Sequence, residues 1–363
     1  MNIQSLQPLG WSQFFLQQLE LDQLDSQQNT YFLFRISAIH RTVIKGLGES
    51  WQAGEIELLC PETFHPVSES FAVGDWVITQ KVNEHFRITQ ILAAKNQLER
   101  LSNQRKQLIA ANIDWLFIVT SANEEFNLKR LERYLAMAYE FQIEPVIVLN
   151  KVDLCDNSDV FINQIQSLNV HEIVRISALQ PDTLQPLTHF LTPSTTIAMV
   201  GSSGVGKSSL VNALFQSQHD KSVPLKTGEV RQDDDKGKHT TTARQLFINS
   251  DGVILIDTPG IRELQLLGAV DGIQQTFSDI VEIAKHCKFS NCHHQNEPGC
   301  HIQQALERGE LTQSHLDNYQ KLLREDAFNA RSAQGAYAQK QHMKEFGKSV
   351  KRAQSSKQQR TNK

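Results

Sequence analysis

The chain has 363 residues, of which 40% are hydrophobic and 21% are charged, so it falls within the range of a soluble globular protein of two or three domains. The N-terminus has no signal-peptide pattern and no apolar run is long enough to span a membrane, which predicts a cytoplasmic protein without membrane contact. The formal net charge is −4, and this average does not indicate whether the chain binds nucleic acid.

The sequence changes character at about residue 30. Residues 1–29 are rich in Gln and Leu and predict a loosely attached helical extension. Residues 31–92 then show five short β-like runs, separated by turn signals around Gly46 and Gly74. Five strands over this length predict a small closed barrel, with the OB-fold as the best candidate. Such barrels often bind oligonucleotides, although core packing explains the aromatic residues equally well.

From about residue 113 the pattern alternates between apolar strands and helices. An apolar strand at 113–122 is followed by an amphipathic helix at 128–141. Further apolar strands lie at 145–150, 172–177, 195–201 and 253–257. Apolar strands separated by helices predict an α/β fold with a parallel sheet that is covered on both faces.

The strand at 145–150 ends in the sequence NKVD, which comprises Asn150, Lys151, Val152 and Asp153. A carboxylate at Asp153 can accept hydrogen bonds from both N1–H and the 2-amino group of guanine, a donor pair that adenine lacks. Asn150 can bond the base edge, and the Lys151 stem can stack on the ring. Ser177 and Ala178 follow the next strand, and a backbone N–H of this companion loop would meet guanine O6. Together they predict a guanine-binding site.

The sequence GSSGVGKS begins at Gly201 and matches the phosphate-loop pattern G-x-x-x-x-G-K-[ST]. It follows a strand and opens a helix, as that function requires. The glycines let backbone N–H groups surround phosphates, and the helix N-terminus adds its dipole. Lys207 would reach the β- and γ-phosphates, and Ser208 would bind Mg²⁺.

The sequence DTPG, Asp257 to Gly260, ends the strand at 253–257. Asp257 would contact Mg²⁺ through water, and the Gly260 N–H would meet the γ-phosphate. A threonine of the segment GKHTTTAR should complete the Mg²⁺ shell, and Thr241 is favoured over Thr240 and Thr242. Ile261 stands where many GTPases place a water-orienting Gln, so His239 is the predicted catalytic residue.

These motifs occur in an unusual order, with the base-reading sequence ahead of the phosphate loop. All of them end parallel strands at one edge of a sheet, so their positions in space do not depend on the order of the chain. The sequence therefore predicts a circularly permuted GTPase that binds GTP with Mg²⁺. The predicted nucleotide site comprises Asn150, Lys151, Val152, Asp153, Ser177, Ala178, Gly201, Ser202, Ser203, Gly204, Val205, Gly206, Lys207, Ser208, Ser209, Thr241, Asp257 and Gly260.

After the DTPG sequence the chain becomes helical and contains a cysteine cluster. Cys287, Cys292, His294 and Cys300 form the pattern C-x₄-C-x-H-x₅-C. Three thiolates and one imidazole make a closed tetrahedral set, which predicts one structural Zn²⁺. His293 is an alternative imidazole and His301 a more distant one.

The last 33 residues form a basic tail. Residues 331–363 contain nine Lys or Arg and one acidic residue, Glu345. The tail is either a solubilising extension or a contact for RNA phosphates. The predicted domains are an extension at 1–29, a barrel at 30–100, the permuted GTPase at 101–265, a zinc-binding domain at 266–330 and the tail at 331–363.

Taken together, the chain resembles the bacterial ribosome small-subunit-dependent GTPases, the RsgA or YjeQ family. The barrel, the sequences GSSGVGKSS, GKHTTTAR and DTPGI, and the zinc pattern carry this resemblance over nearly the whole chain. It implies a monomeric late factor in small-subunit maturation. Barrel, zinc domain and tail would bind rRNA, and the subunit would stimulate GTP hydrolysis, which drives release. It also implies that His239 is the family's switch histidine.

Two other functions fit the same residues. One is a nucleotide-gated binding module whose hydrolysis is incidental, which Ile261 allows. The other is a GTPase that acts on another RNA or on a protein, with the barrel as an adaptor. Strong stimulation of turnover by small ribosomal subunits would favour the assembly factor over the binding module. The acidic run Asp233–Asp235 has no assigned role.

Overall fold

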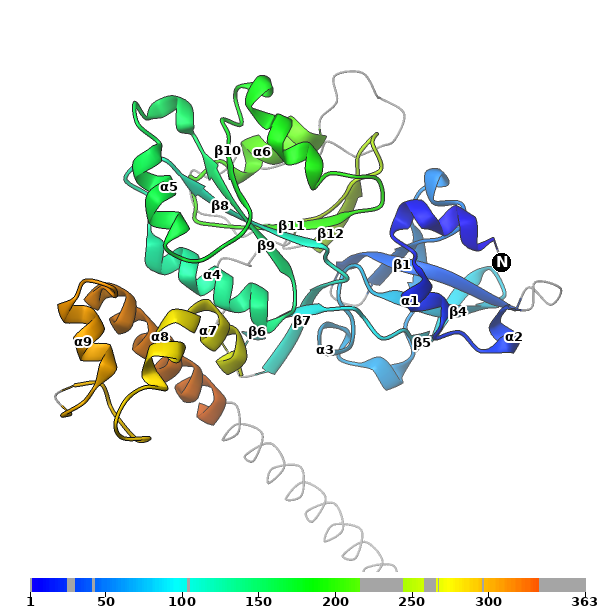
Figure 1. Ribbon diagram of the computed structural model, residues 1–363. Coiled ribbons are helices and arrows are strands. Elements are labelled where there is room, and N and C mark those ends of the chain that lie inside the picture. Colours follow the sequence, from blue (N-terminus) through cyan, green and yellow to red (C-terminus); the bar gives the residue numbers. More distant parts are fainter. Residues whose placement is uncertain are drawn as a thin grey trace, which may run out of the picture.

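The computed structural model of the chain describes residues 2–24, 30–40, 43–102, 105–215, 244–257, 266, 268–295 and 297–332. In these residues eleven strands form one mixed sheet, in the order β10-β9-β8-β11-β13-β12-β1-β2-β3-β5-β4, and β6 and β7 form a separate hairpin. Figure 1 shows strands β1 to β5 with the N-terminal segment on one side, the remaining large sheet with its helices on the other, and the C-terminal helices beside α4.

The first five strands pair in a closed ring. They are β1 (Tyr31–His40), β2 (Val43–Leu47), β3 (Ile56–Leu59), β4 (Trp76–Val82) and β5 (His85–Ile91). Strand β1 pairs with β2 and β4, β2 with β3, β3 with β5, and β5 with β4. Short helices connect the strands: η2 (Trp51–Ala53), η3 (Glu62–Phe64) and α3 (Val67–Ser70). Each of the five strands therefore pairs with at least two others, so none of them is an edge strand of this ring. The OB-fold assignment stays a prediction.

The N-terminal segment packs tightly against this ring. It consists of η1 (Ile3–Leu9), α1 (Gln13–Leu16) and α2 (Leu21–Leu24). Leu6 and Leu9 are fully buried, and Trp11 meets Trp76 of β4 edge-on at a centroid distance of 4.8 Å. The expectation of a loosely attached helix is therefore wrong, because these apolar side chains complete the core instead of facing water.

Strands β8 to β13 form the second part of the sheet. Five of them are parallel: β8 (Trp115–Ser121), β9 (Glu144–Asn150), β10 (Ile173–Arg175), β11 (Thr196–Val200) and β13 (Ile254–Asp257). Strand β12 (Arg244–Ile248) is antiparallel to β13 and was not predicted. The parallel sheet predicted from the apolar runs is thus confirmed for five strands, and β12 makes the sheet mixed.

Helices cover both faces of this part of the sheet. On one face lie α4 (Leu128–Glu140) and α5 (Asp159–Gln166), and on the other lie α6 (Lys207–Phe215) and η5 (Pro181–His189). In β8, Leu116 and Ile118 belong to the first core, whereas Phe117 and Val119 belong to the second. Successive side chains of a strand point to opposite faces, so a strand buried on both sides must be apolar throughout.

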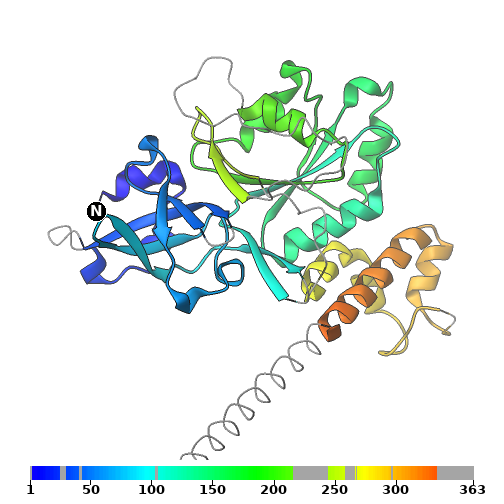
Figure 2. The ribbon, with the colours of Figure 1, turned by 180° about the vertical axis from the view of Figure 1, so that it is seen from behind.

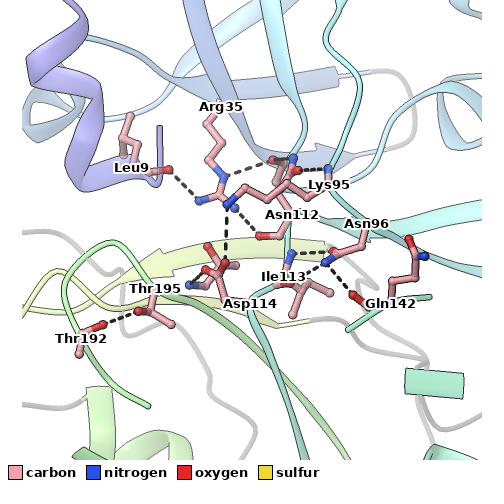
Figure 3. Close-up of polar contacts among 12 residues, drawn as sticks. Leu9, Arg35, Lys95, Asn96, Asn112, Ile113, Asp114, Gln142, Thr192 and Thr195 are labelled. Carbon is pink, nitrogen blue, oxygen red and sulfur yellow. Dashed lines mark hydrogen bonds and ion pairs between the residues drawn. The ribbon is translucent and has the colours of Figure 1, made fainter. Parts of the chain in front are cut away.

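A buried arginine joins the ring to the second part of the sheet (Figure 3). Arg35 donates to the carbonyl oxygens of Leu9 at 2.7 Å, Gly74 at 3.2 Å and Asn112 at 3.2 Å. Burial lowers its pKa to about 10, against the opposing effects of Asp114 and Asp75. Strand β1 also pairs directly with β12, so the sheet continues across this junction.

The hairpin and the C-terminal helices complete the fold. Strand β6 (Gln97–Ser102) pairs with β7 (Arg105–Ala111). The C-terminal region contains α7 (Val270–Thr276), α8 (Ser278–Ala284), α9 (His301–Glu307) and a helix at 313–332. In the view from behind, these helices again lie beside α4 (Figure 2).

None of the helices in the described part of the chain has the length and apolar composition that a membrane crossing requires. The predicted domain boundaries stay a prediction.

Candidate functional site

The predicted nucleotide-binding loops gather at one edge of the sheet. Strands β9, β10, β11 and β13 are parallel, so their carboxyl ends meet at the same edge. The sequence NKVD begins at the last residue of β9, the Ser177 loop follows β10 and the phosphate loop follows β11. Ligands bind at this edge in open α/β sheets, where the order of neighbouring strands reverses. Strand β11 lies between β8 and β13, which places the phosphate loop near the centre.

Asn150 joins three of these loops. Its side chain is only 2% exposed. The Nδ2 group donates to the carbonyl oxygen of Val205 in the phosphate loop at 2.8 Å, and Oδ1 accepts from the backbone N–H of Ala178 at 2.9 Å. The sequence predicted a contact between Asn150 and the base edge, whereas in the structure both ends of its amide connect loops. A buried amide with both ends satisfied rigidifies its surroundings.

The other residues of NKVD differ in their surroundings. Lys151 has a left-handed backbone with φ of +62° and donates from Nζ to the carbonyl oxygen of Gly204 at 2.6 Å. Val152 and Asp153 belong to the single turn η4 (Val152–Leu154), and Asp153 is exposed. The Asp153 carboxylate is therefore accessible to a ligand, while Lys151 lies over the loop.

The Ser177 loop is held from within. The backbone N–H of Ser177 donates to Oγ1 of Thr183 at 2.8 Å, and that hydroxyl donates to the Ser177 carbonyl at 2.9 Å. The backbone N–H of Ala178 goes to Asn150, so in the structure this donor organises the loops instead of pointing outward. Leu179, the next residue of this loop, is 78% exposed.

Glycine is required at two positions of the phosphate loop. Gly201 has φ of +149°, and a side chain there would collide with the carbonyl oxygen of Val119. Gly206 has φ of +95°, and a side chain there would collide with Nδ2 of Asn150. Val205 is buried between them and anchors the loop in the core. The loop is thus shaped by contacts beneath it, with Ser203 and Gly204 exposed above.

Lys207 and the two serines after it begin α6. The Lys207 amine donates to the carbonyl oxygens of Gly201 at 2.9 Å and Ser202 at 2.6 Å, so it lies within the loop. Ser208 is exposed and Ser209 half-buried in the first helical turn. A loop of this shape at a helix N-terminus, with an amine inside it, suits a polyphosphate.

The remaining predicted residues are only partly covered by the structure. Asp257 ends β13, is exposed, and pairs in register with Gln245 of β12. Gly260, His239 and Thr241, with the rivals Thr240 and Thr242, lie outside the described residues.

Arg130 is a residue that the sequence interpretation missed. It lies in the first turn of α4, is half-buried, and donates from Nη1 to the hydroxyl of Ser202. Asn127 caps this helix by accepting from the Arg130 backbone N–H at 3.1 Å. A cation near a helix N-terminus is unfavourable because it opposes the helix dipole. The pair Lys129-Arg130 in the first turn was therefore a sequence signal that one of these residues has a specific partner.

The predicted metal ligands come together in the C-terminal region. The ligand atoms of Cys287, Cys292, His294 and Cys300 all lie within 4.8 Å of one another. His294 Nδ1 is 3.7 Å from Cys287 Sγ and 3.6 Å from Cys300 Sγ. Tetrahedral zinc with bonds of about 2.0–2.3 Å places its ligand atoms at such separations. Of the three candidate imidazoles, His294 is the one inside the cluster.

The protonation of this cluster also suits a metal. Desolvation lowers the pKa of His294, which favours the neutral ring that binds metals. Desolvation and the thiols of Cys300 and Cys287 raise the pKa of Cys292 to about 11. A thiol must lose its proton to bind a cation, so metal binding at Cys292 would release a proton.

Comparison with known proteins identifies the family to which the chain is similar. A model of the RsgA GTPase family matches residues 91–267. The chain is 42% identical over 356 residues to the small ribosomal subunit biogenesis GTPase RsgA 2 of Vibrio parahaemolyticus, a match that covers 98% of this chain and 94% of that protein.

Two solved structures share the fold. The crystal structure of YjeQ from Thermotoga maritima matches with a TM-score of 0.59 at 26% identity, covering 81% of this chain and 98% of that one. YloQ, described as a circularly permuted GTPase, matches with a TM-score of 0.56 at 25% identity, covering 84% and 97%. The predicted circular permutation is confirmed.

Proposed function

The chain belongs to the RsgA GTPase family and is a GTPase, and we propose that it is a late maturation factor of the small ribosomal subunit. In this proposal the factor binds rRNA, the subunit stimulates its hydrolysis of GTP to GDP and phosphate, and hydrolysis releases it. The name of the relative from Vibrio parahaemolyticus supports the ribosomal role. The observation that carries the nucleotide site is the Asn150 amide, which bonds both the phosphate loop and the Ser177 loop.

Guanine would be selected by Asp153, whose exposed carboxylate can accept from both guanine donors. Lys151 lies over the phosphate loop, where its stem can pack on the ring of the base. Asn150 sets the separation between this base-reading segment and the phosphate loop. The predicted site is thereby preorganised, which reduces the entropy cost of binding.

The phosphates would be held by the backbone N–H groups of Gly201 to Ser209, with the Lys207 amine moving from two loop carbonyls to phosphate oxygens. Mg²⁺ would neutralise phosphate charge, held by Ser208 and Thr241, with Asp257 contacting it through water. Gly260 would offer its N–H to the γ-phosphate, and His239 would orient the attacking water in place of the Gln that Ile261 replaces.

Zn²⁺ would occupy the cluster of Cys287, Cys292, His294 and Cys300 in a structural role. The donor set and its separations fit the ion, and four protein ligands leave no open position for a substrate. The metal would hold the chain between α8 and α9, where regular secondary structure is sparse.

The rRNA-binding surface would comprise the ring of β1 to β5, the zinc-binding region and the basic tail. The closed pairing order of the ring supports its assignment to the OB-fold. We further place the protein in the cytoplasm as a monomer, in keeping with a role on ribosomal subunits.

Turnover of GTP with purified ribosomal subunits tests this proposal. Small subunits should raise the rate about a thousandfold or more, the scale of GTPase activation in trans, whereas large subunits should not. His239→Ala should lose most of the stimulation, and His171→Ala, which changes an exposed histidine away from the loops, should keep it.

Other results would redirect the assignment. Stimulation that survives in His239→Ala would move catalysis to a ribosomal group. Nucleotide-dependent subunit binding without stimulation would favour a nucleotide-gated binding module. No response to small subunits would contradict the ribosomal role. It would favour a GTPase that acts on another RNA or on a protein.

A further inference from the structure

The first turns of α4 contact both the phosphate loop and the C-terminal helices. At the loop, Arg130 donates to the hydroxyl of Ser202, whose carbonyl oxygen accepts from Lys207. This charge-assisted hydrogen bond joins the first turn of α4 to the phosphate loop.

Two residues further along α4, a buried polar cluster holds the C-terminal region. Glu132 is 1% exposed, and its carboxylate accepts from His315 Nδ1 at 2.5 Å and from Asn318 Nδ2 at 2.5 Å. His315 Nε2 also donates to Asp279 of α8 at 3.2 Å. Asn318 reaches back to the Lys129 carbonyl at 3.3 Å. This cluster therefore joins α4 to α8 and to the helix at 313–332.

Two more contacts extend this attachment along α4. Arg133 forms a bidentate pair with Glu325, with N–O distances of 2.6 and 2.5 Å. Glu140 accepts from the backbone N–H of Gly272 in α7 at 3.1 Å. Arg130 and Arg133 are one helical turn apart, so the loop contact and the C-terminal contacts share the same rigid segment.

We propose that Arg130 is a positioning residue of the phosphate loop and that α4 links nucleotide binding to the docking of the C-terminal helices. This inference rests on the proposed nucleotide site. Arg130 holds Ser202 from outside while Lys207 leaves its carbonyl for the phosphates. A shift of α4 caused by release of the C-terminal helices would move Arg130 and loosen the loop. By linkage, nucleotide binding then stabilises the docked helices by the same free energy.

The first test measures GDP affinity in the full chain with a fluorescent GDP analogue. Arg130→Ala should weaken binding roughly fivefold to tenfold, the size of a charge-assisted hydrogen bond at a half-buried site. Arg130→Lys should recover part of the loss because it keeps a charged donor. Lys129→Ala, which removes the exposed neighbouring cation from the same turn, should change affinity less than about twofold.

The second test probes the link with a double-mutant cycle. Glu325→Gln should weaken GDP binding about threefold in the parent chain and have no effect when Arg130 is already Ala. Hydrogen exchange supplies an independent readout: GDP should slow exchange in residues 313–332 of the parent chain but not of Arg130→Ala. Urea unfolding of each variant shows that it is folded.

The outcomes separate the inference from the function on which it rests. Unchanged GDP affinity in Arg130→Ala overturns the positioning role. An equal effect of Glu325→Gln in both backgrounds, with GDP leaving exchange in 313–332 unaltered, overturns the link. Failure of the folded parent chain to bind GDP overturns the proposed site itself.

Discussion

At the scale of single residues, the site depends on side chains that organise loops rather than on those that face a ligand. Asn150 is the clearest case. Its amide donates to a carbonyl oxygen 55 residues away and accepts from a backbone N–H 28 residues away. Asp153, three positions along, is exposed and bonds to none of these loops in the described residues. The two residues of this motif therefore differ in their contacts, and substituting each in turn should affect stability and nucleotide binding differently.

Asn150→Ala should damage both stability and nucleotide binding. It leaves the Val205 carbonyl and the Ala178 N–H without their partners in a buried site, which costs about 2 kcal/mol of unfolding free energy. Because the phosphate loop loses its support, affinity for GDP and GTP should fall roughly tenfold or more. Urea unfolding and nucleotide titration measure the two effects.

Asp153→Asn is the matched control. In the proposed site its exposed carboxylate serves base recognition, so guanine nucleotide affinity should fall while unfolding free energy changes less than about 0.5 kcal/mol. Equal loss of stability in both variants would contradict the division of roles proposed for this motif.

At the scale of elements, α4 is the point where the C-terminal helices attach, and His315 is central to that contact. Burial alone would lower the pKa of His315, but hydrogen bonds and charge from Asp279 and Glu132 outweigh burial and raise it to about 9. The same pair holds the pKa of Asp279 below its usual value, against burial. The ring also packs on Phe277 at a centroid distance of 4.8 Å, so a charged imidazole lies between carboxylates and an aromatic face.

This attachment should depend on pH. A histidine whose folded pKa lies above its unfolded value stabilises the fold fully below about pH 6.5, and this stabilisation is lost as pH rises through 9. The shift corresponds to roughly 3 kcal/mol as an upper figure. Urea unfolding and hydrogen exchange of residues 313–332 between pH 6 and about pH 9.5 measure the loss.

His315→Gln serves as the reference for that experiment. Gln keeps a donor but has no charge to lose, so its stability should be lower at pH 6 and nearly flat toward pH 9. A parent chain whose C-terminal exchange is as flat as that of His315→Gln would show that the imidazole is not charged in the folded state.

The metal cluster in the C-terminal region can be tested by its metal content. We expect one zinc per chain by elemental analysis, lost in Cys292→Ser and retained in Cys155→Ser, a half-buried thiol outside the cluster. His294→Ala should also lose the metal, whereas His293→Ala should keep it. Full zinc content in His294→Ala would return the fourth position to His293 or His301.

At the scale of the whole molecule, one sheet runs through two regions that the sequence divides. Strand β1 of the ring pairs with β12, and β12 pairs in turn with β13, which carries Asp257. Gly74, in the turn before β4, donates from its N–H to Ile36 and is too close to Ala111 for any side chain. The ring is thus attached through β12 to β13, the strand that ends at the predicted Mg²⁺ residue.

Arg35→Lys should weaken this junction severely. A lysine cannot reach the three carbonyl oxygens of Leu9, Gly74 and Asn112 together, so at least one stays buried without a donor. We expect a loss of about 3 kcal/mol in unfolding free energy. Lys45→Met, which removes an exposed pair with Glu55 at 3.2 Å, should cost less than about 1 kcal/mol. Equal losses would contradict the special role of Arg35.

Motif chemistry could be predicted from the sequence because it is local. The glycines of GSSGVGKS, the apolar strand before NKVD and the close spacing of Cys287 and Cys292 each depend on neighbours in the chain. Each motif marks the carboxyl end of one strand, so these features also predicted that the loops lie at one edge of a parallel sheet. The permuted fold and the metal cluster followed from this local information.

Contacts between distant segments required the tertiary structure. The partners of Asn150, the bond from Arg130 to Ser202 and the contact between Glu132 and His315, 183 residues apart, have no spacing rule in the sequence. The same holds for the pairing of β1 with β12 and for the N-terminal leucines, whose pattern fitted a loose helix but whose side chains fill a core. Packing decides these contacts, because burial is favourable only where the fold brings a complementary surface within reach.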